Sequence, residues 1–162
     1  MLKLSKKSEY ALMVVQFLGH PERNRPTPAA VFAQRHNLPP TLLAKVMQSL
    51  KRGGILRSSK GVAGGYWLAR PLSEIDFIDV IRPFEQVIGL ATCVESHTEP
   101  CELLGCCTIR DPVSKLNDFV IRQLEQLSMA DFVAMDTNHI QGRIGHSIQA
   151  IETNNVSLNL PH

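Results

Sequence analysis

A run of glycines between two short apolar stretches constrains the fold of this 162-residue chain more than any other feature. The segment 60–65 reads K-G-V-A-G-G and separates the apolar stretches 55–58 and 66–69. Glycine adopts positive φ angles without steric cost, so such a run favours a turn between two β-strands. We therefore expect an antiparallel hairpin whose strands are 55–58 and 66–69.

The chain before this hairpin predicts three helices. Apolar residues recur at helical spacing after Ser5, a common N-cap residue, and the first helix ends at Gly19. A short second helix has Thr27 as its expected N-cap and runs to about Arg35. The third helix covers 40–52 and ends at a pair of glycines. Its apolar face is formed by Leu43, Val46, Met47 and Leu50.

Two short helices joined by a tight turn and packed on an earlier helix form a helix-turn-helix, and the hairpin that follows is a wing. The expected fold class is mainly α with a small β-hairpin wing, that is, a winged helix-turn-helix plus a long dimerisation helix. The second helix of the motif enters the major groove, while a glycine-rich wing tip approaches DNA closely between flanking cations. The expected DNA-binding residues are Thr41, Lys45, Gln48, Lys51, Arg57, Lys60 and Gly64.

The charges of the chain are unevenly distributed. The formal net charge is only +2, which by itself says little about nucleic acid. Most Lys and Arg residues nevertheless lie before residue 71, where the only acidic residues are Glu9 and Glu22. A cationic first half followed by an acidic second half favours a DNA-binding module joined to a different one, although a solvated helix face would also carry these charges.

The second half predicts a short helix capped by Ser73 or Asp76, a long helix opened by Pro112, and a brief helix after the capping box Ser128-x-x-Asp131. The long helix suits a dimer interface, and the alternative is a helix that packs on its own domain. Its apolar residues are Leu116, Phe119, Val120, Leu124 and Leu127. We expect four regions: the DNA-binding domain 1–83, a cysteine loop 84–111, dimerisation helices 112–136, and a partly flexible tail 137–162.

All four cysteines lie within one short segment, with the spacing C-x7-C-x4-C-C. Thiolates gathered at one point bind zinc or iron–sulfur clusters. The start of the chain has no secretory signal, so we expect a cytoplasmic protein, in which a structural disulfide is disfavoured. The apolar runs are too short to cross a bilayer, and we expect no membrane partner. Neither a nucleophile–base set nor a P-loop is present, so we expect no enzyme.

The segment 49–69, S-L-K-R-G-G-I-L-R-S-S-K-G-V-A-G-G-Y-W-L-A, together with the cysteines after it, resembles the Rrf2 family over about residues 1–135. The resemblance implies a winged helix-turn-helix homodimer that binds a palindromic operator on double-stranded DNA. Family members include regulators of iron–sulfur assembly, nitric-oxide sensors and iron-responsive regulators. Many of them hold an iron–sulfur cluster by three loop cysteines.

Carried over by position, the three ligand cysteines are Cys93, Cys101 and Cys107, the last because C-T-I-R-D-P aligns with the start of the long helix. The assembly regulator has a histidine three residues after its third cysteine, where this chain has Arg110. The fourth ligand of that member therefore cannot be transferred.

In other members the fourth ligand is an acidic residue from the first helix of the partner subunit, and the matching residue here is Glu9, in E-Y-A-L. His97 and Cys106 remain alternatives. The resemblance favours a 2Fe–2S cluster, with 4Fe–4S as the alternative.

The resulting expectation is a homodimeric transcription regulator, acting as a repressor, that senses redox state, nitric oxide or iron status through its cluster. The competing hypothesis is a DNA-binding regulator without a cluster. Such a protein would hold a structural zinc ion at Cys93, His97, Cys101 and Cys107, or it would use a thiol–disulfide switch.

Overall fold

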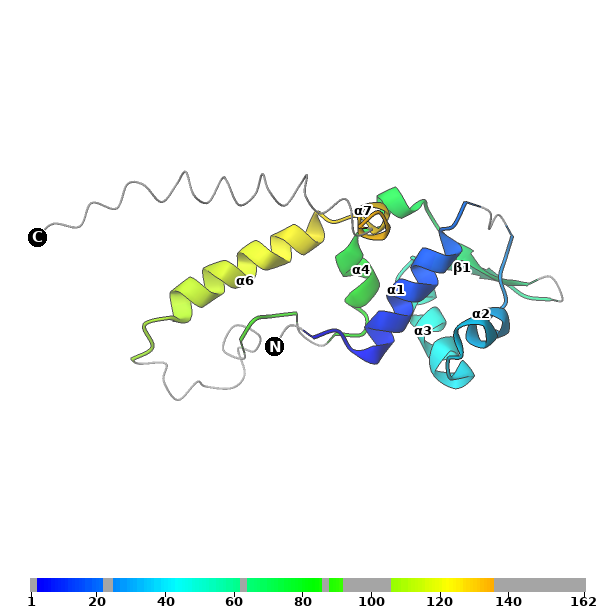
Figure 1. The fold of residues 1–162 in the computed structure, drawn as a ribbon, viewed down its shortest axis with the longest axis horizontal. Coiled ribbons are helices and arrows are strands. Elements are labelled where there is room, and N and C mark those ends of the chain that lie inside the picture. The colour runs from blue at the N-terminus through cyan, green and yellow to red at the C-terminus, as the bar shows by residue number, and fades with distance from the viewer. Residues whose placement is uncertain (1–2, 22–24, 62–63, 86–87, 92–105, 136–162) are drawn as a thin grey trace, which may run out of the picture.

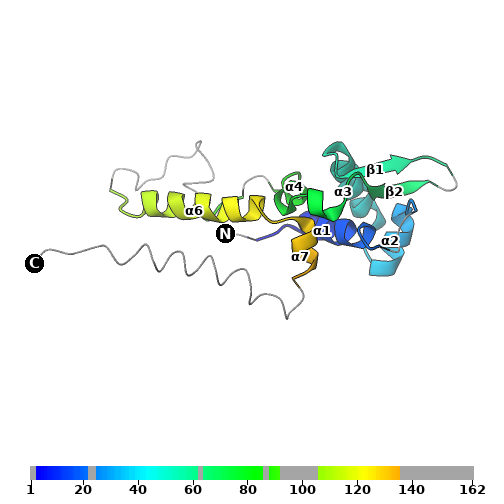
Figure 2. The same ribbon diagram turned by 90° about the horizontal axis from the view of Figure 1, so that it is seen from above.

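The computed structural model shows a helical body from which one long helix extends (Figures 1 and 2). Within the described part of the chain, no helix is long and apolar enough to span a bilayer. The predicted tail 137–162 lies outside the described residues. The structure describes residues 3–21, 25–61, 64–85, 88–91 and 106–135.

Helix α1, Lys6–Leu18, lies at the centre of the body and contacts α3, α4, α7 and the second strand. It begins as predicted, because the Oγ of the N-cap Ser5 accepts the backbone N–H of Ser8 at 3.3 Å. One face of the helix is buried over most of its length. The residues of this face are Ser8, Ala11, Leu12, Val14, Val15 and Leu18.

Helices α2, Ala29–His36, and α3, Pro40–Arg52, form the predicted helix-turn-helix. Helix α3 has the predicted bounds and the predicted buried face. The predicted N-cap of α2 is wrong. The cap is Pro28, which has no side chain to cap with, and Thr27 instead pairs with the hairpin. The turn between the helices passes through Asn37 in the left-handed conformation, φ 50°, which asparagine tolerates better than most residues.

The wing consists of the antiparallel strands β1, Leu56–Ser59, and β2, Gly65–Leu68. Each strand differs from the prediction by one residue. Thr27 and Tyr66 exchange two backbone hydrogen bonds of 2.9 Å, so the chain before α2 pairs with β2 through one antiparallel bridge. This pairing explains why Thr27 is unavailable as a cap: its backbone is committed to the sheet.

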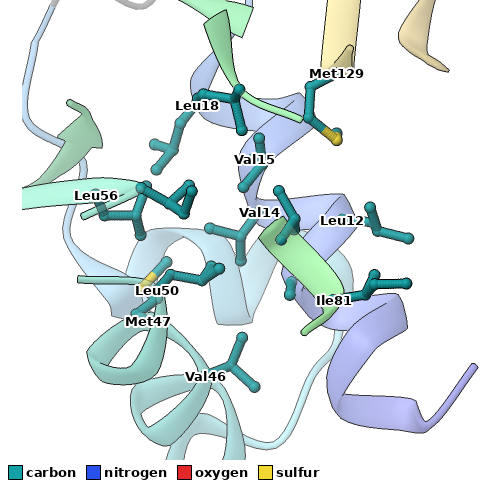
Figure 3. Packing of buried hydrophobic residues seen from close by; sticks show 14 of the residues in the cluster. Leu12, Val14, Val15, Leu18, Val46, Met47, Leu50, Leu56, Ile81 and Met129 are labelled. Carbon is teal, nitrogen blue, oxygen red and sulfur yellow. The ribbon is translucent and has the colours of Figure 1, made fainter. Parts of the chain in front are cut away.

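A single hydrophobic cluster holds these elements together (Figure 3). Side chains from α1, α2, α3, β1, α4 and α7 converge in it. Burying one such side chain stabilises the fold by about 1.5–3 kcal/mol, so the several buried side chains of α3 hold this helix firmly against α1. The largest fully buried members are Phe32, Leu43, Met47, Leu50, Ile55, Leu56, Ile75, Ile81 and Met129.

The later helices are α4, Phe77–Ile81, α6, Arg110–Glu125, and α7, Met129–Val133. The long helix α6 begins two residues before the predicted Pro112. After α6 the chain returns to the body. There the N–H of Phe77 donates to the carbonyl of Leu127 at 2.8 Å, and the N–H of Met129 donates to that of Ile75 at 2.7 Å. Helix α7 begins as predicted, because the Oγ of its N-cap Ser128 accepts the N–H three residues later at 3.0 Å.

Candidate DNA-binding surface and cysteine segment

The recognition helix α3 is buried on one side and polar on the other. Its buried residues anchor it to α1 and α2, so the opposite side faces solvent over the full length of the helix. The predicted DNA-binding residues of α3, namely Thr41, Lys45, Gln48 and Lys51, are all exposed. Arg52, which sequence reasoning did not single out, is exposed at the end of the same helix.

The wing carries two more exposed cations, Arg57 and Lys60. Within the described part of the chain, Lys45, Lys51 and Lys60 take part in no ion pair. Their ammonium groups are therefore available for phosphate oxygens, and no internal carboxylate has to be displaced first.

The wing glycines have a structural role. Gly61 has φ 108°, and the N–H of Gly64 donates to its carbonyl at 2.9 Å. A Cβ added at Gly64 would lie 2.6 Å from the carbonyl oxygen of Ser59. Gly64, predicted to contact DNA, therefore also closes the turn, and a side chain there would open it. Gly65 is equally crowded, with an added Cβ 2.5 Å from the carbonyl carbon of Thr27.

Glu9, the predicted fourth ligand, lies in the first turn of α1. Its side chain is 41% exposed, and its Oε2 accepts a hydrogen bond from the ammonium of Lys6 at 2.6 Å. This hydrogen bond to Glu9 raises the pKa of Lys6. The carboxylate of Glu9 is thus accessible, and its partner is a flexible surface side chain.

A second carboxylate at the start of α1 was not predicted. Oε1 of Glu85, just after α4, accepts the backbone N–H of Ser5 at 2.8 Å and the hydroxyl of the fully buried Ser8. Partial burial acts to raise the pKa of Glu85, but the hydrogen bonds from Ser8 and Ser5 outweigh it and lower that pKa. The chain that leaves α4 toward the cysteines is therefore fastened to the first turn of α1, next to Glu9.

Of the four cysteines, Cys106 and Cys107 lie in the described part of the chain, shortly before α6 begins at Arg110. Cys106 is exposed, Cys107 is half-buried, and both are free thiols. Cys93, Cys101 and His97 lie outside the described residues. Among the described residues no group of three His, Cys, Asp or Glu side chains is placed to hold a metal ion. The donors that are described, a free thiol and an accessible carboxylate, fit the chemistry of an iron–sulfur or zinc ligand set.

Helix α6 has two apolar stripes. The stripe toward the body contains Val113, Val120 and Leu124, all half-buried, with the polar Asn117 among them. Asn117 is the one buried residue of the helix. The flank of the helix next to this stripe leaves large apolar side chains in solvent. These are Ile109, 64% exposed, Leu116, 54% exposed, and Phe119, 36% exposed.

The body, the wing and the polar face of α3 define the class of the protein as a winged helix-turn-helix. A family model described as Rrf2, iron-dependent transcriptional regulator, matches residues 4–135. The chain therefore belongs to the Rrf2 family of transcriptional regulators.

Known proteins resemble the chain over most of its length. It is 27% identical over 132 residues to the HTH-type transcriptional regulator NsrR of Geobacillus kaustophilus, a match that covers 82% of this chain and 90% of the relative. The structure of CymR, the global cysteine regulator of B. subtilis, superposes with a TM-score of 0.65 at 28% identity, covering 84% of this chain and 99% of that one. The structure of T. potens IscR, at 20% identity and a TM-score of 0.62, covers 90% and 96% of the two chains and shares the fold.

Proposed function

We propose that this chain is a homodimeric regulator that binds a palindromic operator and senses redox state, nitric oxide or iron status through a cluster at its cysteine segment. The observation that carries the DNA-binding half of the proposal is the set of exposed cations Lys45, Lys51 and Lys60 on the recognition helix and wing, which form no ion pair with any described residue. The rigid packing of α3 on α1 supports their use as a fixed reading surface, because bases are read only by side chains held in register.

The dimer is proposed from the outer stripe of α6. Ile109, the N-cap of α6, lies on the same flank as Leu116 and Phe119 within the helix, and all three leave apolar side chains in water. A second copy of α6 packed antiparallel would cover this stripe on both subunits, and the two recognition helices would then be related by a two-fold axis. A palindromic operator follows from that symmetry.

The sensing half rests on the family description and on the donors. We assign Cys93, Cys101 and Cys107 as thiolate ligands and Glu9 of the partner subunit as the fourth ligand. A bound cluster would supply a centre that reacts with nitric oxide or oxygen or changes its charge on reduction. To bind the cluster, the carboxylate of Glu9 would have to give up its hydrogen bond with the ammonium group of Lys6. Glu9 lies on α1, and α1 packs on the recognition helix α3. A change of the ligand bound to Glu9 that moves α1 would therefore also move α3.

Such coupling typically amounts to about 1–3 kcal/mol, that is, about five- to 150-fold in operator affinity. The operator is bound either with the cluster or without it. Which of the two states binds depends on the conformation in which the spacing of the two recognition helices matches the operator. We propose repression, with the signal releasing the operator.

The second candidate is a thiol–disulfide switch without iron. The observation in its favour is that Cys106 is an exposed free thiol directly beside Cys107, which is the placement that oxidation requires. A structural zinc ion held by Cys93, His97, Cys101 and Cys107 belongs to the same class of explanation, because neither option involves iron.

The deciding measurement is the absorbance spectrum of anaerobically purified protein, with iron and acid-labile sulfide counted per chain. Cluster binding predicts a coloured protein that contains both elements. Cys107→Ser should lose the colour and the matched variant Cys106→Ser should keep it. A colourless wild type without iron after anaerobic reconstitution would refute the cluster and favour zinc or thiol chemistry. Glu9→Ala with unchanged cluster stability and DNA affinity would remove Glu9 from the ligand set.

A further inference from the structure

The hairpin places a tryptophan on the side of the wing that faces away from the core. In the register of the two strands Arg57 lies opposite Trp67, and Leu56 lies opposite Leu68. Since successive side chains of a strand point to opposite faces, these two pairs lie on opposite faces of the hairpin. Leu56 is buried and Leu68 packs against the hydrophobic cluster, whereas Trp67 is half-buried and is not among the described residues that form or pack against that cluster. Arg57 and Trp67 therefore lie together on the outer face of the wing, and we call them the outer wing pair.

The polar groups of the outer wing pair have no partner in the described part of the chain. The guanidinium of Arg57 is exposed and forms no ion pair or hydrogen bond with a described residue. The indole N–H of Trp67 donates to no described residue either. Tryptophan joins a large apolar ring to a single donor and is for that reason enriched at binding interfaces. Both side chains are thus available to a ligand that offers an apolar surface next to an anion.

The charge around the outer wing pair indicates a polyanionic partner. Between Arg25 and Ser73 the sequence contains no Asp or Glu. A surface of one sign attracts partners of the opposite sign and repels those of its own. The recognition helix and the wing lie at the same end of the molecule, away from α6 (Figures 1 and 2), and the family is one of transcriptional regulators. DNA is therefore the partner that this face fits best. The Lys and Arg residues of the stretch are Arg25, Arg35, Lys45, Lys51, Arg52, Arg57, Lys60 and Arg70.

We propose that the outer wing pair is a second DNA contact of the wing, beside its glycine-rich tip. The guanidinium of Arg57 binds a backbone phosphate, and the indole of Trp67 packs on the deoxyribose next to it. Residues directly opposite each other in a hairpin have Cβ atoms about 4.5–5.5 Å apart, and one DNA strand advances about 3.4 Å per nucleotide, so the two side chains reach the same or neighbouring nucleotides. Contacts to phosphate and sugar fix the position of a protein on DNA and carry no base sequence. The proposal rests on the proposed function for DNA binding and is independent of the cluster.

The competing explanation for the outer wing pair is purely structural. An arginine opposite a tryptophan stabilises a hairpin without any ligand, because the cation and the ring attract each other across the strands. The two roles lead to different results. A structural pair would change the stability of the wing alone, whereas a DNA contact also makes the surroundings of the indole depend on bound DNA.

The fluorescence of the protein tests this directly, because Trp67 is the only tryptophan of the chain. The full chain is titrated at low salt with a mixed-sequence DNA duplex of about 30 base pairs, conditions under which binding needs no specific sequence. The anisotropy of a dye on the DNA measures binding independently of the tryptophan. We expect bound DNA to change the emission of Trp67 and to reduce its quenching by acrylamide, and added salt to reverse both. Polyglutamate, which offers anionic charge without sugars, should not protect the ring.

Substitutions separate the two members of the pair. Trp67→Val keeps a residue that favours strands and removes the ring; it should weaken binding to the duplex about tenfold, equivalent to about 1.4 kcal/mol, and Trp67→Phe should recover most of this loss. Urea unfolding of each variant shows whether the fold is retained. Arg57→Ala should lower the magnitude of the slope of log K against log salt concentration by about 1. Lys115→Ala, which removes an exposed cation of α6, is the matched control and should leave the slope unchanged.

Three results would overturn the outer wing pair as a DNA contact. They are a tryptophan whose emission and acrylamide quenching stay the same in fully DNA-bound protein, a folded Trp67→Val protein that binds the duplex as tightly as the wild type, and polyglutamate that protects the ring as well as DNA does. A wild type that binds no DNA at low salt would overturn the proposed function together with the pair. DNA binding with a silent tryptophan removes the pair alone. A protein without iron whose tryptophan responds to DNA keeps the pair and loses the cluster.

Discussion

Glu85 offers the sharpest quantitative prediction about the fold. Its Oε1 accepts two hydrogen bonds, one from the backbone N–H of Ser5 and one from the hydroxyl of the fully buried Ser8. A hydrogen bond to a charged group stabilises by about 1.5–3 kcal/mol. In the Glu85→Ala variant the N–H of Ser5 can turn to water, whereas the hydroxyl of Ser8 is left with the hydroxyl of Ser5, 3.3 Å away, in place of a carboxylate. We therefore expect the variant to lose about 2–3 kcal/mol of the free energy of unfolding at pH 7.

The pH dependence of this loss follows from the pKa of Glu85. The folded-state pKa is lowered from its ordinary value of 4.5, so the folded protein binds the carboxyl proton more weakly than the unfolded chain does. The stabilisation is fully present above pH 4.5 and is lost as the pH falls through the folded-state pKa. The difference in stability between wild type and Glu85→Ala should thus be constant between pH 6 and 7, at about the value above, and shrink in acid.

Urea unfolding of a double-mutant cycle isolates the pair. Ser8→Ala, Glu85→Ala and the double variant should give a coupling free energy of about 1–2 kcal/mol at pH 7. Glu74→Ala, at an exposed acidic position before α4, is the control and should change stability by less than about 0.5 kcal/mol. A coupling free energy near zero would refute the reasoning, because Glu85 would then stabilise α1 without the hydroxyl of Ser8.

Three further predictions concern the wing, the long helix and DNA. Gly65→Ala should cost about 1–3 kcal/mol in urea unfolding, since its Cβ would lie 2.5 Å from the carbonyl carbon of Thr27; an unchanged midpoint would contradict the close approach of wing and body. Leu116→Asp should shift the protein to monomer in sedimentation velocity with unchanged helix content, whereas Lys115→Ala should not; a dimeric Leu116→Asp would exclude α6 as the interface. Lys60→Ala should weaken binding to specific and non-specific DNA alike, and the slope of log K against log salt concentration should fall in magnitude by about 1. A loss of affinity for one DNA sequence alone would show that Lys60 contacts a base.

Local rules predicted the DNA-binding body well, for physical reasons that differ between elements. Helix α3 has its predicted bounds because a proline at its start, two glycines at its end and a continuous apolar face all agree. The cap of α2 was wrong because Thr27 has two uses. Its side chain suits a cap, but its backbone pairs with Tyr66, and no local pattern reveals a partner so far along the chain.

The contacts beside the cysteine segment could not be predicted from the sequence either, because they also join residues far apart in the chain. Glu85 meets Ser8 across 77 positions, and propensity says nothing at that range. Asn117 did leave a signal, a polar residue on the apolar stripe of a long helix, which the heptad-like spacing of Val113 and Val120 makes visible. The ligand set of Cys93, Cys101, Cys107 and Glu9 stays a prediction, because the spacing of cysteines in a loop does not determine which of them meet.

Contacts between residues far apart in the sequence attach α6 to the rest of the described chain. At its C-terminal end the helix continues into backbone hydrogen bonds with the body, through Leu127 and Met129. The ion pair of Arg82 with Glu125, at 3.5 Å and half-exposed, adds at most about 1 kcal/mol. In the described part of the chain, the middle of α6 is held by a hydrogen bond of 3.1 Å from the backbone N–H of Leu90 to Oδ1 of Asn117. Glu85, earlier in the same stretch of chain, accepts hydrogen bonds from Ser5 and Ser8 at the start of α1. The chain before the cysteine segment therefore contacts both α1 of the DNA-binding body and the long helix α6.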